Sequence, residues 1–323
     1  MPSPAPIALS CGEPAGIGPE IAEKAWAALQ GELCFFWIGD PAHLPGDIPV
    51  QLIDSPEQAD MRQGLPVLAH AFPKPRQPGQ PDPENAAQVI EVIVKAVRLA
   101  QSGAASAICT VPIHKQALQD GAGFGFPGHT EFLAHLAGVD QVVMMLACSE
   151  LRVVPATIHI ALADVPGQLT AAGLRDTIRL THAGLRSDFG IAQPRLAVAG
   201  LNPHAGEGGK MGQEEITLIT PVIEDLRAEG LTISGPLSAD TMFHPAARAR
   251  YDAAVCMYHD QALIPIKTID FSSGVNVTLG LPFVRTSPDH GTAFDIAGRG
   301  IADADSLIAA LRMARDMAEA RAQ

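Results

Sequence analysis

The segment from Tyr258 to Gly300 carries more reactive side chains than the packing of a hydrophobic core requires. It reads YHDQALIPIKTIDFSSGVNVTLGLPFVRTSPDHGTAFDIAGRG, so two histidine–aspartate pairs, a lysine, an asparagine and an arginine lie among glycines and small apolar residues. Histidine and aspartate can transfer protons or bind a metal ion, and lysine and arginine can bind anionic groups. The segment is therefore a candidate for an enzyme active site.

Five polar motifs each follow a short apolar run that predicts a β-strand. They are GEPAGIG after residues 6–11, VPIHK after 105–110, His159 after 152–158, NPHAGEGG after 195–201 and HDQ after 253–258. In open α/β sheets, ligands bind at the carboxyl ends of the strands. We therefore expect these motifs to contribute to one composite site.

Three of these motifs contain a histidine that could ligate a divalent metal: His159, His204 and His259. Imidazole ligands suit Zn, Co or Ni, and Asp240 and Asp260 could add oxygen ligands or orient the imidazole rings. The three histidines are far apart in the sequence and form no local HExxH pattern. The alternative, that each histidine only caps or hydrogen-bonds a loop, stays open.

The motif GHTEF at residues 128–132 allows two interpretations. It is a simple helix N-cap, or its backbone N–H groups, the Thr130 hydroxyl and His129 form a subsite for an anion or a hydroxyl group. Three further polar residues have mainly apolar or glycine neighbours, at a spacing of nine positions: Lys267, Asn276 and Arg285. That setting favours a ligand-facing position for at least two of them over the solvated position that is usual for such residues.

Helical patterns separate the predicted strands. Asp82 and Pro83 begin one helix, because an aspartate cap followed by proline is typical of a helix N-terminus, and Pro19 begins another. Further helices are predicted at about residues 170–188, 213–229 and 304–320. This alternation of strands and helices indicates an α/β protein with a largely parallel sheet.

Residues 40–83 do not follow this alternation. Six prolines occur from Pro66 to Pro83, and the amphipathic periodicity is weak. Proline interrupts helices and removes hydrogen bonds from central strands. We interpret the segment as a peripheral excursion and not as a separate domain.

Composition argues against several classes of function. The chain of 323 residues has a formal net charge of −13, which is unfavourable for a general nucleic-acid or anionic-membrane binder. The five cysteines show no CxxC spacing, so neither a disulfide framework nor a thiolate zinc site is expected. The first residues have no basic region and no long apolar run, and no later segment predicts a bilayer span. We therefore expect a cytoplasmic enzyme.

Taken together, the motifs resemble the 4-hydroxythreonine-4-phosphate dehydrogenase family of pyridoxal phosphate biosynthesis. Nine segments carry the resemblance, in the order GEPAGIGPE, HK at 114–115, GHTEF, TIHIAL, LNPHAGEGG, GPLSADTMF, YHDQ, GVNVTLGLPFVRTS and DHGTAFDIAGRG. The family has an isocitrate/isopropylmalate-dehydrogenase-like fold. The resemblance therefore implies largely parallel sheets with flanking helices, in two interleaved subdomains around an active-site cleft. Their approximate ranges are residues 1–130 with 255–323, and residues 131–254.

The resemblance also implies a role for each candidate residue. A divalent metal (Zn, Mg or Co) is implied to bind His159, His204 and His259, one of them supplied across a homodimer interface. The implied substrate contacts are His129, Thr130, Lys267, Asn276 and Arg285. The implied contacts with the adenosine end of NAD or NADP are His290, Gly291, Thr292 and Asp295. The candidate catalytic residues are Lys267, Asp240 and Asp260.

The implied reaction is the NAD-dependent oxidation of 4-phosphohydroxy-L-threonine at its 3-hydroxyl. It gives 2-amino-3-oxo-4-phosphooxybutanoate, which decarboxylates to 3-amino-2-oxopropyl phosphate. A metal would lower the pKa of the substrate hydroxyl, and Lys267 and Arg285 would neutralise and orient the anionic groups of the substrate.

Two alternative activities fit part of the pattern. A related metal-dependent dehydrogenase would act on threonate or erythronate phosphate, or on a dihydrodiol dicarboxylate, with the same metal and cofactor residues. A non-redox phosphate acyltransferase resembles the same fold but needs neither three metal-binding histidines nor the DHGTAFDIAG loop. The chain has no convincing GxGxxG motif, because GEGGKMG lacks the strand-to-helix context. In the family's fold, glycine-rich loops bind the cofactor instead.

Overall fold

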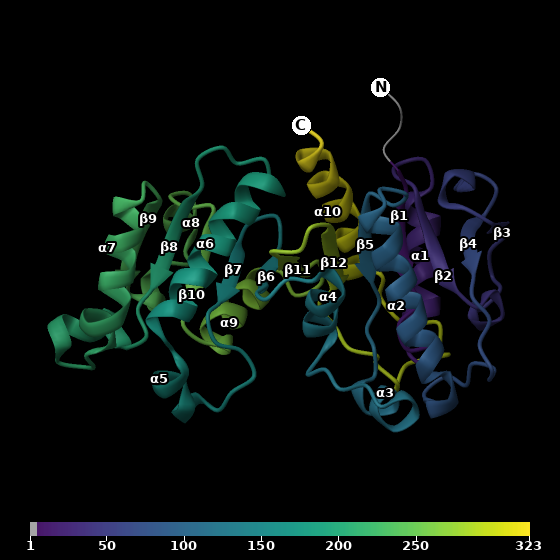
Figure 1. Ribbon diagram of the computed structural model, residues 1–323, viewed down its shortest axis with the longest axis horizontal. Helices are drawn as coiled ribbons and strands as arrows, with labels where there is room; N and C mark the ends of the chain where they lie inside the picture. Colours follow the sequence, from purple (N-terminus) through teal and green to yellow (C-terminus); the bar gives the residue numbers. More distant parts are fainter. Residues whose placement is uncertain (1–4) are drawn as a thin grey trace. The chain divides into compact units, whose positions relative to one another are not determined.

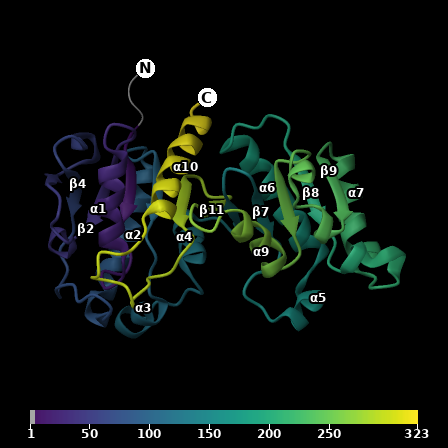
Figure 2. The same cartoon turned by 180° about the vertical axis from the view of Figure 1, so that it is seen from behind.

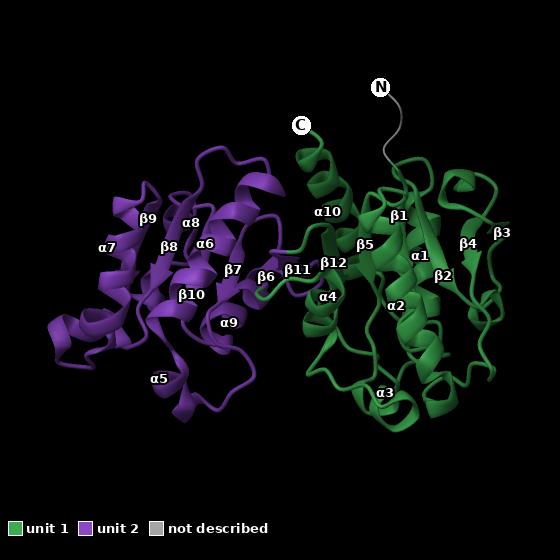
Figure 3. Ribbon diagram, viewed as in Figure 1, with its two compact units in different colours: residues 1–141, 281–323 green, residues 142–280 purple. Residues whose placement is uncertain are grey.

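The computed structural model describes residues 5–323 and divides the chain into two compact units (Figure 3). The first unit contains the described residues up to Gln141 together with Leu281–Gln323, and the second contains Val142–Gly280. The boundaries expected from the sequence differ, because residues 131–141 belong to the first unit and residues 255–280 to the second. Residues 255–280 follow a strand that pairs on both sides with strands of the second unit, a long-range contact that local sequence patterns do not reveal.

The first unit contains a parallel sheet with the strand order β3–β4–β2–β1–β5–β12. The strands are β1 (Ile7–Ser10), β2 (Phe35–Gly39), β3 (Val50–Ile53), β4 (Leu65–Ala69), β5 (Ala107–Thr110) and β12 (Val284–Pro288). Every residue of β1, β2, β5 and β12 is buried, as expected for parallel strands with helices on both faces. The side chains of Phe35, Phe36 and Trp37 fill the core around β2.

Helices cover the two faces of this sheet. They are α1 (Gly18–Leu29), α2 (Ala86–Gln101), α3 (Lys115–Ala122), α4 (His129–Ala137) and α10 (Asp305–Arg321), with short 3-10 turns at Pro41–His43, Pro56–Gln58 and Pro83–Asn85. Helix α2 lies in front of the strands in Figure 1, whereas α1 and α10 lie in front in Figure 2, where they pack side by side. The Asp82 side chain accepts a hydrogen bond from the Glu84 backbone N–H (3.0 Å), which confirms the predicted helix start.

The second unit contains a mixed sheet with the strand order β11–β6–β7–β10–β8–β9. The strands are β6 (Val143–Ala147), β7 (Arg152–Pro155), β8 (Arg195–Ala199), β9 (Thr232–Leu237), β10 (Ala253–Cys256) and β11 (Val275–Leu279). β6 runs antiparallel to β7 and β11, and the remaining pairs are parallel. The three parallel strands β7, β10 and β8 are therefore neighbours, and their carboxyl ends meet at one edge.

Helical segments connect the strands of the second unit. They are α5 (Val165–Gln168), α6 (Ala171–Ser187), α7 (Thr220–Ala228), α8 (Pro245–Arg248), α9 (His259–Ile269), a π-helical turn at Glu215–Ile219 and 3-10 turns at Leu162–Asp164, Pro203–Gly209 and Ala239–Thr241. The helix predicted at 213–229 is thus a π turn followed by α7, with Pro221 in the first turn of α7. Helix α9 packs on β7, β10 and β6 through a buried cluster that includes Val153, Ala262 and Ile266.

The predicted α/β class with largely parallel strands and flanking helices is confirmed. Residues 40–83 are an excursion at the sheet edge, as predicted, but they also contribute the parallel strands β3 and β4. The sequence analysis predicted neither strand: β3 is a four-residue edge strand without clear alternation, and β4 contains Pro66. Within residues 5–323, no helix combines the length and the apolarity needed to cross a membrane.

Candidate active site

The five polar motifs all lie at the carboxyl ends of strands, as predicted. GEPAGIG follows β1 and VPIHK follows β5 in the first unit, where the two strands are parallel neighbours. His159, NPHAGEGG and HDQ follow β7, β8 and β10 in the second unit, whose strands are also parallel neighbours. Within each unit, the motifs are therefore gathered at one edge of the sheet.

Side-chain hydrogen bonds tie the three strand ends of the second unit together. The buried Gln261 accepts a hydrogen bond from the Met257 backbone N–H (2.7 Å) and donates one to the Gly200 carbonyl (2.7 Å). The Thr157 hydroxyl donates to the Met257 carbonyl (2.7 Å). Because these residues follow β7, β8 and β10, the bonds set the spacing of the loops that carry the three candidate metal ligands.

His159 and His259 are close to each other. Their ring centroids are 5.7 Å apart, with 42° between the ring planes. His259 Nδ1 lies 2.7 Å from an Asp260 carboxylate oxygen, the arrangement that orients a metal-binding imidazole and leaves its Nε2 for the ion. His159 has a φ of 56°, in the left-handed region that a non-glycine residue rarely adopts.

His204 lies in a loop with a continuous left-handed backbone. His204, Ala205, Gly206, Glu207 and Gly208 all have φ between 43° and 77°. Each non-glycine residue in this conformation costs about 1–3 kcal/mol, so the surrounding structure must stabilise the loop.

The buried Glu215 carboxylate provides that support. Its two oxygens accept hydrogen bonds from the backbone N–H (2.7 Å) and the side-chain amide (3.0 Å) of Asn202, two residues before His204. A Cβ on Gly206 would lie 2.6 Å from Glu215 Oε2, so the loop wraps closely around this carboxylate.

The described residues of one chain do not complete a metal centre. No group of three or more histidine, cysteine, aspartate or glutamate residues within 5–323 is arranged to hold an ion. The donor chemistry of the pair fits a divalent transition metal, because the His159 and His259 imidazoles lie close together and the Asp260 carboxylate hydrogen-bonds to one of them. Asp240 lies in the 3-10 turn Ala239–Thr241, which packs against the His204 loop, and it accepts a 2.5 Å hydrogen bond from Ser238.

Arg285 and His129 form a second group of candidate residues, in the first unit. Arg285 is only 4% exposed on β12, and its guanidinium donates to the Thr110 hydroxyl (2.7 and 3.2 Å). Burial lowers the pKa of Arg285 to about 10, so the side chain is still cationic at neutral pH. Burial, together with the charge of Arg285, holds the pKa of His129 well below its usual value, so this imidazole is neutral.

The His129 side chain has unused hydrogen-bonding capacity. Its Nε2 is buried and has no hydrogen-bond partner among the described residues. Buried polar atoms are almost always paired, so an unpaired nitrogen beside a buried cation indicates a position for a bound polar group. Helix α4 begins at His129 and its N-cap is Gly128. Thr130 therefore lies inside the first turn and is not the cap.

Lys267 and Asn276 belong to the second unit. Lys267 lies on α9, with its Nζ 5.6 Å from the centroid of the Phe271 ring, close enough for a cation–π contact. Asn276 lies in β11 opposite Leu146 and is partly exposed. The structure therefore divides the candidate substrate contacts between the units, with Lys267 and Asn276 in one and the group around Arg285 in the other.

The loop His290–Asp295 follows β12 in the first unit and contacts the GEPAGIG turn. The Thr292 carbonyl accepts a hydrogen bond from the Ile17 N–H (3.1 Å), and the His114 and Phe294 rings meet edge to face at 5.0 Å. His290 Nδ1 lies 2.9 Å from the Gly291 carbonyl oxygen, and its Nε2 is buried without a described partner. The loop thus presents a buried polar atom to a ligand while its backbone is fixed.

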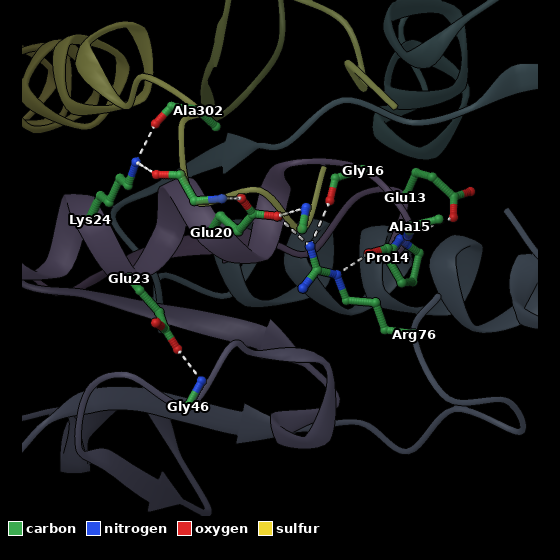
Figure 4. Close-up of polar contacts among 12 residues, drawn as sticks. Glu13, Pro14, Ala15, Gly16, Glu20, Glu23, Lys24, Gly46, Arg76 and Ala302 are labelled. Carbon is green, nitrogen blue, oxygen red and sulfur yellow. Dashed lines mark hydrogen bonds and ion pairs between the residues drawn. The ribbon is translucent and has the colours of Figure 1, made fainter. Parts of the chain in front are cut away.

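Charged residues that the sequence analysis did not single out hold the backbone just after this loop (Figure 4). Glu20 and Lys24 of α1 hydrogen-bond to the backbone of residues 298–302, and Arg76 pairs with Glu20. Gln261 and Glu215 were also not recognised as positioning residues. For Arg76, the sequence offered only its position within a proline-rich segment. Arginines in such segments are common at protein surfaces, so this position does not predict a buried ion pair.

Comparisons with known proteins agree with this geometry. Residues 32–314 match the family described as pyridoxal phosphate biosynthetic protein PdxA. The chain is 64% identical over 320 residues to the 4-hydroxythreonine-4-phosphate dehydrogenase of Paracoccus denitrificans, with 98% of each chain covered.

Two solved structures extend the comparison. The crystal structure of 4-hydroxythreonine-4-phosphate dehydrogenase from Klebsiella pneumoniae is similar with a TM-score of 0.91 and 38% identity, covering 98% of this chain and 99% of that one. A terephthalate 1,2-cis-dihydrodiol dehydrogenase from Burkholderia xenovorans is less similar, with a TM-score of 0.68 and 29% identity, covering 97% and 98%. The resemblance inferred from the sequence is confirmed, and the chain belongs to the PdxA family of pyridoxal phosphate biosynthetic proteins.

Proposed function

We propose that this protein is a 4-hydroxythreonine-4-phosphate dehydrogenase of pyridoxal phosphate biosynthesis. It oxidises the 3-hydroxyl of 4-phosphohydroxy-L-threonine with a nicotinamide cofactor, and the β-keto acid product, 2-amino-3-oxo-4-phosphooxybutanoate, decarboxylates to 3-amino-2-oxopropyl phosphate. The observation that carries the proposal is 64% identity over 98% of the chain to a relative with that activity.

In this proposal, Arg285, His129 and Thr130 bind an anionic group of the substrate. The buried cation of Arg285 supplies the attraction, and the unpaired His129 Nε2 and the first turn of α4 add directional hydrogen bonds. Lys267 and Asn276 are the remaining proposed substrate contacts. Water is a poor competitor for such a site, because the arginine is already desolvated.

His159, His204 and His259 are the proposed ligands of a divalent metal, Zn, Co or Mg. Such an ion would stabilise negative charge on the substrate oxygen during oxidation and decarboxylation. Asp260 orients the His259 imidazole, and Asp240 beside the His204 loop is a candidate for proton transfer together with Lys267.

The proposed cofactor is NAD or NADP, with its adenosine end on His290, Gly291, Thr292 and Asp295. The Asp295 carboxylate favours NAD, because it can accept hydrogen bonds from ribose hydroxyls and would repel the 2′-phosphate of NADP. A comparison of the KM values for NAD and NADP tests this preference.

We assign the protein to the cytoplasm and to a homodimer with a shared active site. Large apolar side chains are exposed on the second unit, on or next to the segments that carry the candidate metal ligands; they are Ile160, Leu162, Met211, Ile216, Ile264 and Phe271. Exposed apolar groups of this size favour association of two copies, and in this proposal one of the three histidine ligands comes from the second copy.

Subunit mixing tests the shared site. His204→Ala and His259→Ala are each expected to be inactive alone. If His204 and His259 of one site come from different chains, a heterodimer of the two variants keeps one intact site, and an equal mixture recovers about a quarter of the wild-type activity. A mixture that stays inactive after confirmed subunit exchange would place His204 and His259 of each site in the same chain.

One assay tests the activity itself. Adding 4-phosphohydroxy-L-threonine and NAD is expected to produce NADH absorbance that a chelator abolishes and added metal restores. A panel containing threonate phosphate, erythronate phosphate and a dihydrodiol dicarboxylate tests the neighbouring activity suggested by the Burkholderia xenovorans structure. Absence of chelator-sensitive NADH with every substrate would refute the dehydrogenase proposal.

A further inference from the structure

The loop between β12 and α10, residues 289–304, has no regular secondary structure, so other groups must fix its backbone. Two side chains of α1 do so. Glu20 accepts hydrogen bonds from the backbone N–H groups of Gly298 (2.5 Å) and Gly300 (3.2 Å), and Lys24 Nζ donates to the carbonyls of Gly300 (2.9 Å) and Ala302 (2.5 Å). The carboxylate thus binds N–H groups of the loop backbone, and the ammonium group binds its carbonyl groups (Figure 4).

Arg76 holds the carboxylate in turn. Its Nη2 donates to Glu20 Oε1 (2.7 Å) and to the Gly16 carbonyl (3.3 Å), and its Nε donates to the Pro14 carbonyl (2.9 Å). The side chains of Arg76 and Glu20 are only 9% and 6% exposed. The guanidinium group therefore connects the Glu20 carboxylate to the backbone of the GEPAGIG turn. A lysine ammonium on its flexible stem would not bind both partners in this fixed geometry.

The segment that follows Arg76 also contacts the loop. The Gly79 N–H donates to the Ala15 carbonyl (2.8 Å), and a Cβ on Gly79 would lie 2.9 Å from the Phe294 carbonyl oxygen. A Cβ on Gly298 would lie 2.7 Å from Pro78. The proline-rich segment is therefore packed against the loop and is not only a surface excursion.

Packing alone does not explain how the loop is held. A cavity of about 590 Å³ is lined by Gly298, Arg299 and Gly300 on one side, and by Glu20, Arg76 and Pro78 among others. This part of the loop therefore has empty space next to it where a core residue would have neighbours. Its position depends on the hydrogen bonds to Glu20 and Lys24.

We propose that Arg76, acting through Glu20, is a positioning residue for the adenosine end of the nicotinamide cofactor. The proposal rests on the proposed function, in which residues 290–295 bind the adenosine. Arg76 is not one of the proposed cofactor contacts; it orients the carboxylate that fixes residues 298–300, and so keeps the preceding residues in their binding geometry. Loss of Arg76 should therefore weaken cofactor binding and leave substrate binding intact.

The test compares variants of the full-length protein by NADH fluorescence titration and steady-state kinetics. Arg76→Gln is expected to raise the NADH Kd and the KM for NAD about tenfold or more, while kcat at saturating NAD and the KM for substrate stay within about twofold. Arg76→Lys keeps the charge and should recover part of the affinity. Arg62→Lys is the matched control, because Arg62 also pairs with a carboxylate, Asp60, in the same excursion but is 84% exposed.

A second pair of variants separates positioning from folding. Arg76→Gln leaves the Glu20 carboxylate buried without its cation, so the doubly substituted Glu20→Gln/Arg76→Gln removes the unpaired charge and should restore thermal stability. The NADH Kd of the double variant should stay raised, because the amide that replaces the Glu20 carboxylate has a single acceptor oxygen for the backbone N–H groups of Gly298 and Gly300.

The outcomes are distinct. An unchanged NADH Kd in Arg76→Gln, or in the double variant if the single one does not fold, overturns the inference. Equal losses in NAD binding, substrate binding and kcat overturn it as well, because they indicate a general structural role. If Asp295→Asn binds NADH like wild type, the assignment of the adenosine loop is wrong, and that failure is separate from the result for Arg76.

Discussion

The loop of residues 289–304 in the first unit and the loops after β7, β8 and β10 in the second are held by different forces. Charged side chains hold the first loop. Glu20 and Lys24 hydrogen-bond to its backbone, and Arg76 forms an ion pair with Glu20. In the second region, the neutral side chains of Gln261 and Thr157 connect the strand ends, and the Glu215 carboxylate supports the left-handed loop of His204 from within the same unit.

The difference matches what each region is proposed to bind. A metal ion requires ligand atoms placed to within a few tenths of an ångström, and short hydrogen bonds between neighbouring strand ends can set such distances. An adenosine group is large and tolerates small shifts of its loop. Charge–backbone bonds are strong enough to order a loop that has a cavity beside it.

The largest expected effect is that of His204→Ala. Loss of one of three imidazole ligands should reduce metal affinity more than about a hundredfold and abolish turnover, while the fold is kept because His204 is exposed. Metal content by elemental analysis and the initial rate of NADH formation measure this, with His182→Ala on α6 as the control. Near-normal metal content and rate in His204→Ala would remove His204 from the ligand set.

Arg285→Ala tests the anion site of the first unit. Truncation of this buried cation should weaken ground-state binding of the phosphorylated substrate by about 3 kcal/mol, a roughly hundredfold rise in KM. Arg285→Lys keeps a cation but loses the fork, so its KM should rise less. Steady-state kinetics measure both, and an unchanged KM in Arg285→Ala would exclude Arg285 from the substrate site.

Gly206→Ala tests whether Glu215 shapes the His204 loop. The new Cβ would lie 2.6 Å from Glu215 Oε2 at a φ of +77°, and we expect a loss of about 2–3 kcal/mol in the free energy of unfolding. Gly208→Ala is the matched control, since its φ is +66° but its Cβ meets nothing within 4 Å, and it should cost about 1 kcal/mol. Urea denaturation measures both; equal losses would show that the backbone alone, and not the carboxylate, determines the loop.

Gln261→Glu separates the two bonds of this side chain. A carboxylate still accepts from the Met257 N–H, but it cannot donate to the Gly200 carbonyl, so the end of β8 is released from that of β10. Metal affinity measured by equilibrium dialysis should fall about tenfold. Gln63→Glu, on the surface of the first unit, controls for the added charge. Unchanged metal affinity in Gln261→Glu would show that the neutral bonds do not set the ligand spacing.

The smallest expected effect is a pH dependence of stability from His129. The pKa of His129 is well below its usual value in the folded state, so the unfolded chain binds the proton more readily. The contribution of neutral His129 to the free energy of unfolding is fully present above about pH 6.5. It is lost as the pH falls below that value, by up to about 1.4 kcal/mol per pH unit. His129→Gln should flatten the fall in unfolding free energy between pH 7 and pH 5.

His182→Gln provides the comparison in the second unit. Burial and Arg186 also lower the pKa of His182, but this side chain is less buried, so its substitution should flatten the curve less. An identical slope in His129→Gln and wild type would contradict a neutral, buried His129.

The local parts of this fold could be predicted, and the long-range parts could not. Strand ends and helix starts were found because apolar runs, Asp82 and Pro83 act within a few residues. Residues 255–280 were assigned to the wrong unit, because only the pairing of β10 with β7 and β8 decides where they belong. β3 was missed because a four-residue strand at the sheet edge leaves little hydrophobic pattern.

The same division applies to the candidate site. The sequence by itself determined which residue types are present and that the polar motifs follow strands, since both depend on local order along the chain. Only the tertiary structure brought His159 to His259, buried His129 beside Arg285 and made Arg76 the support of a loop more than two hundred residues away in sequence. The burial and pairing of a side chain depend on which segments meet in space. The proline-rich sequence around Arg76 therefore does not predict that Arg76 pairs with Glu20.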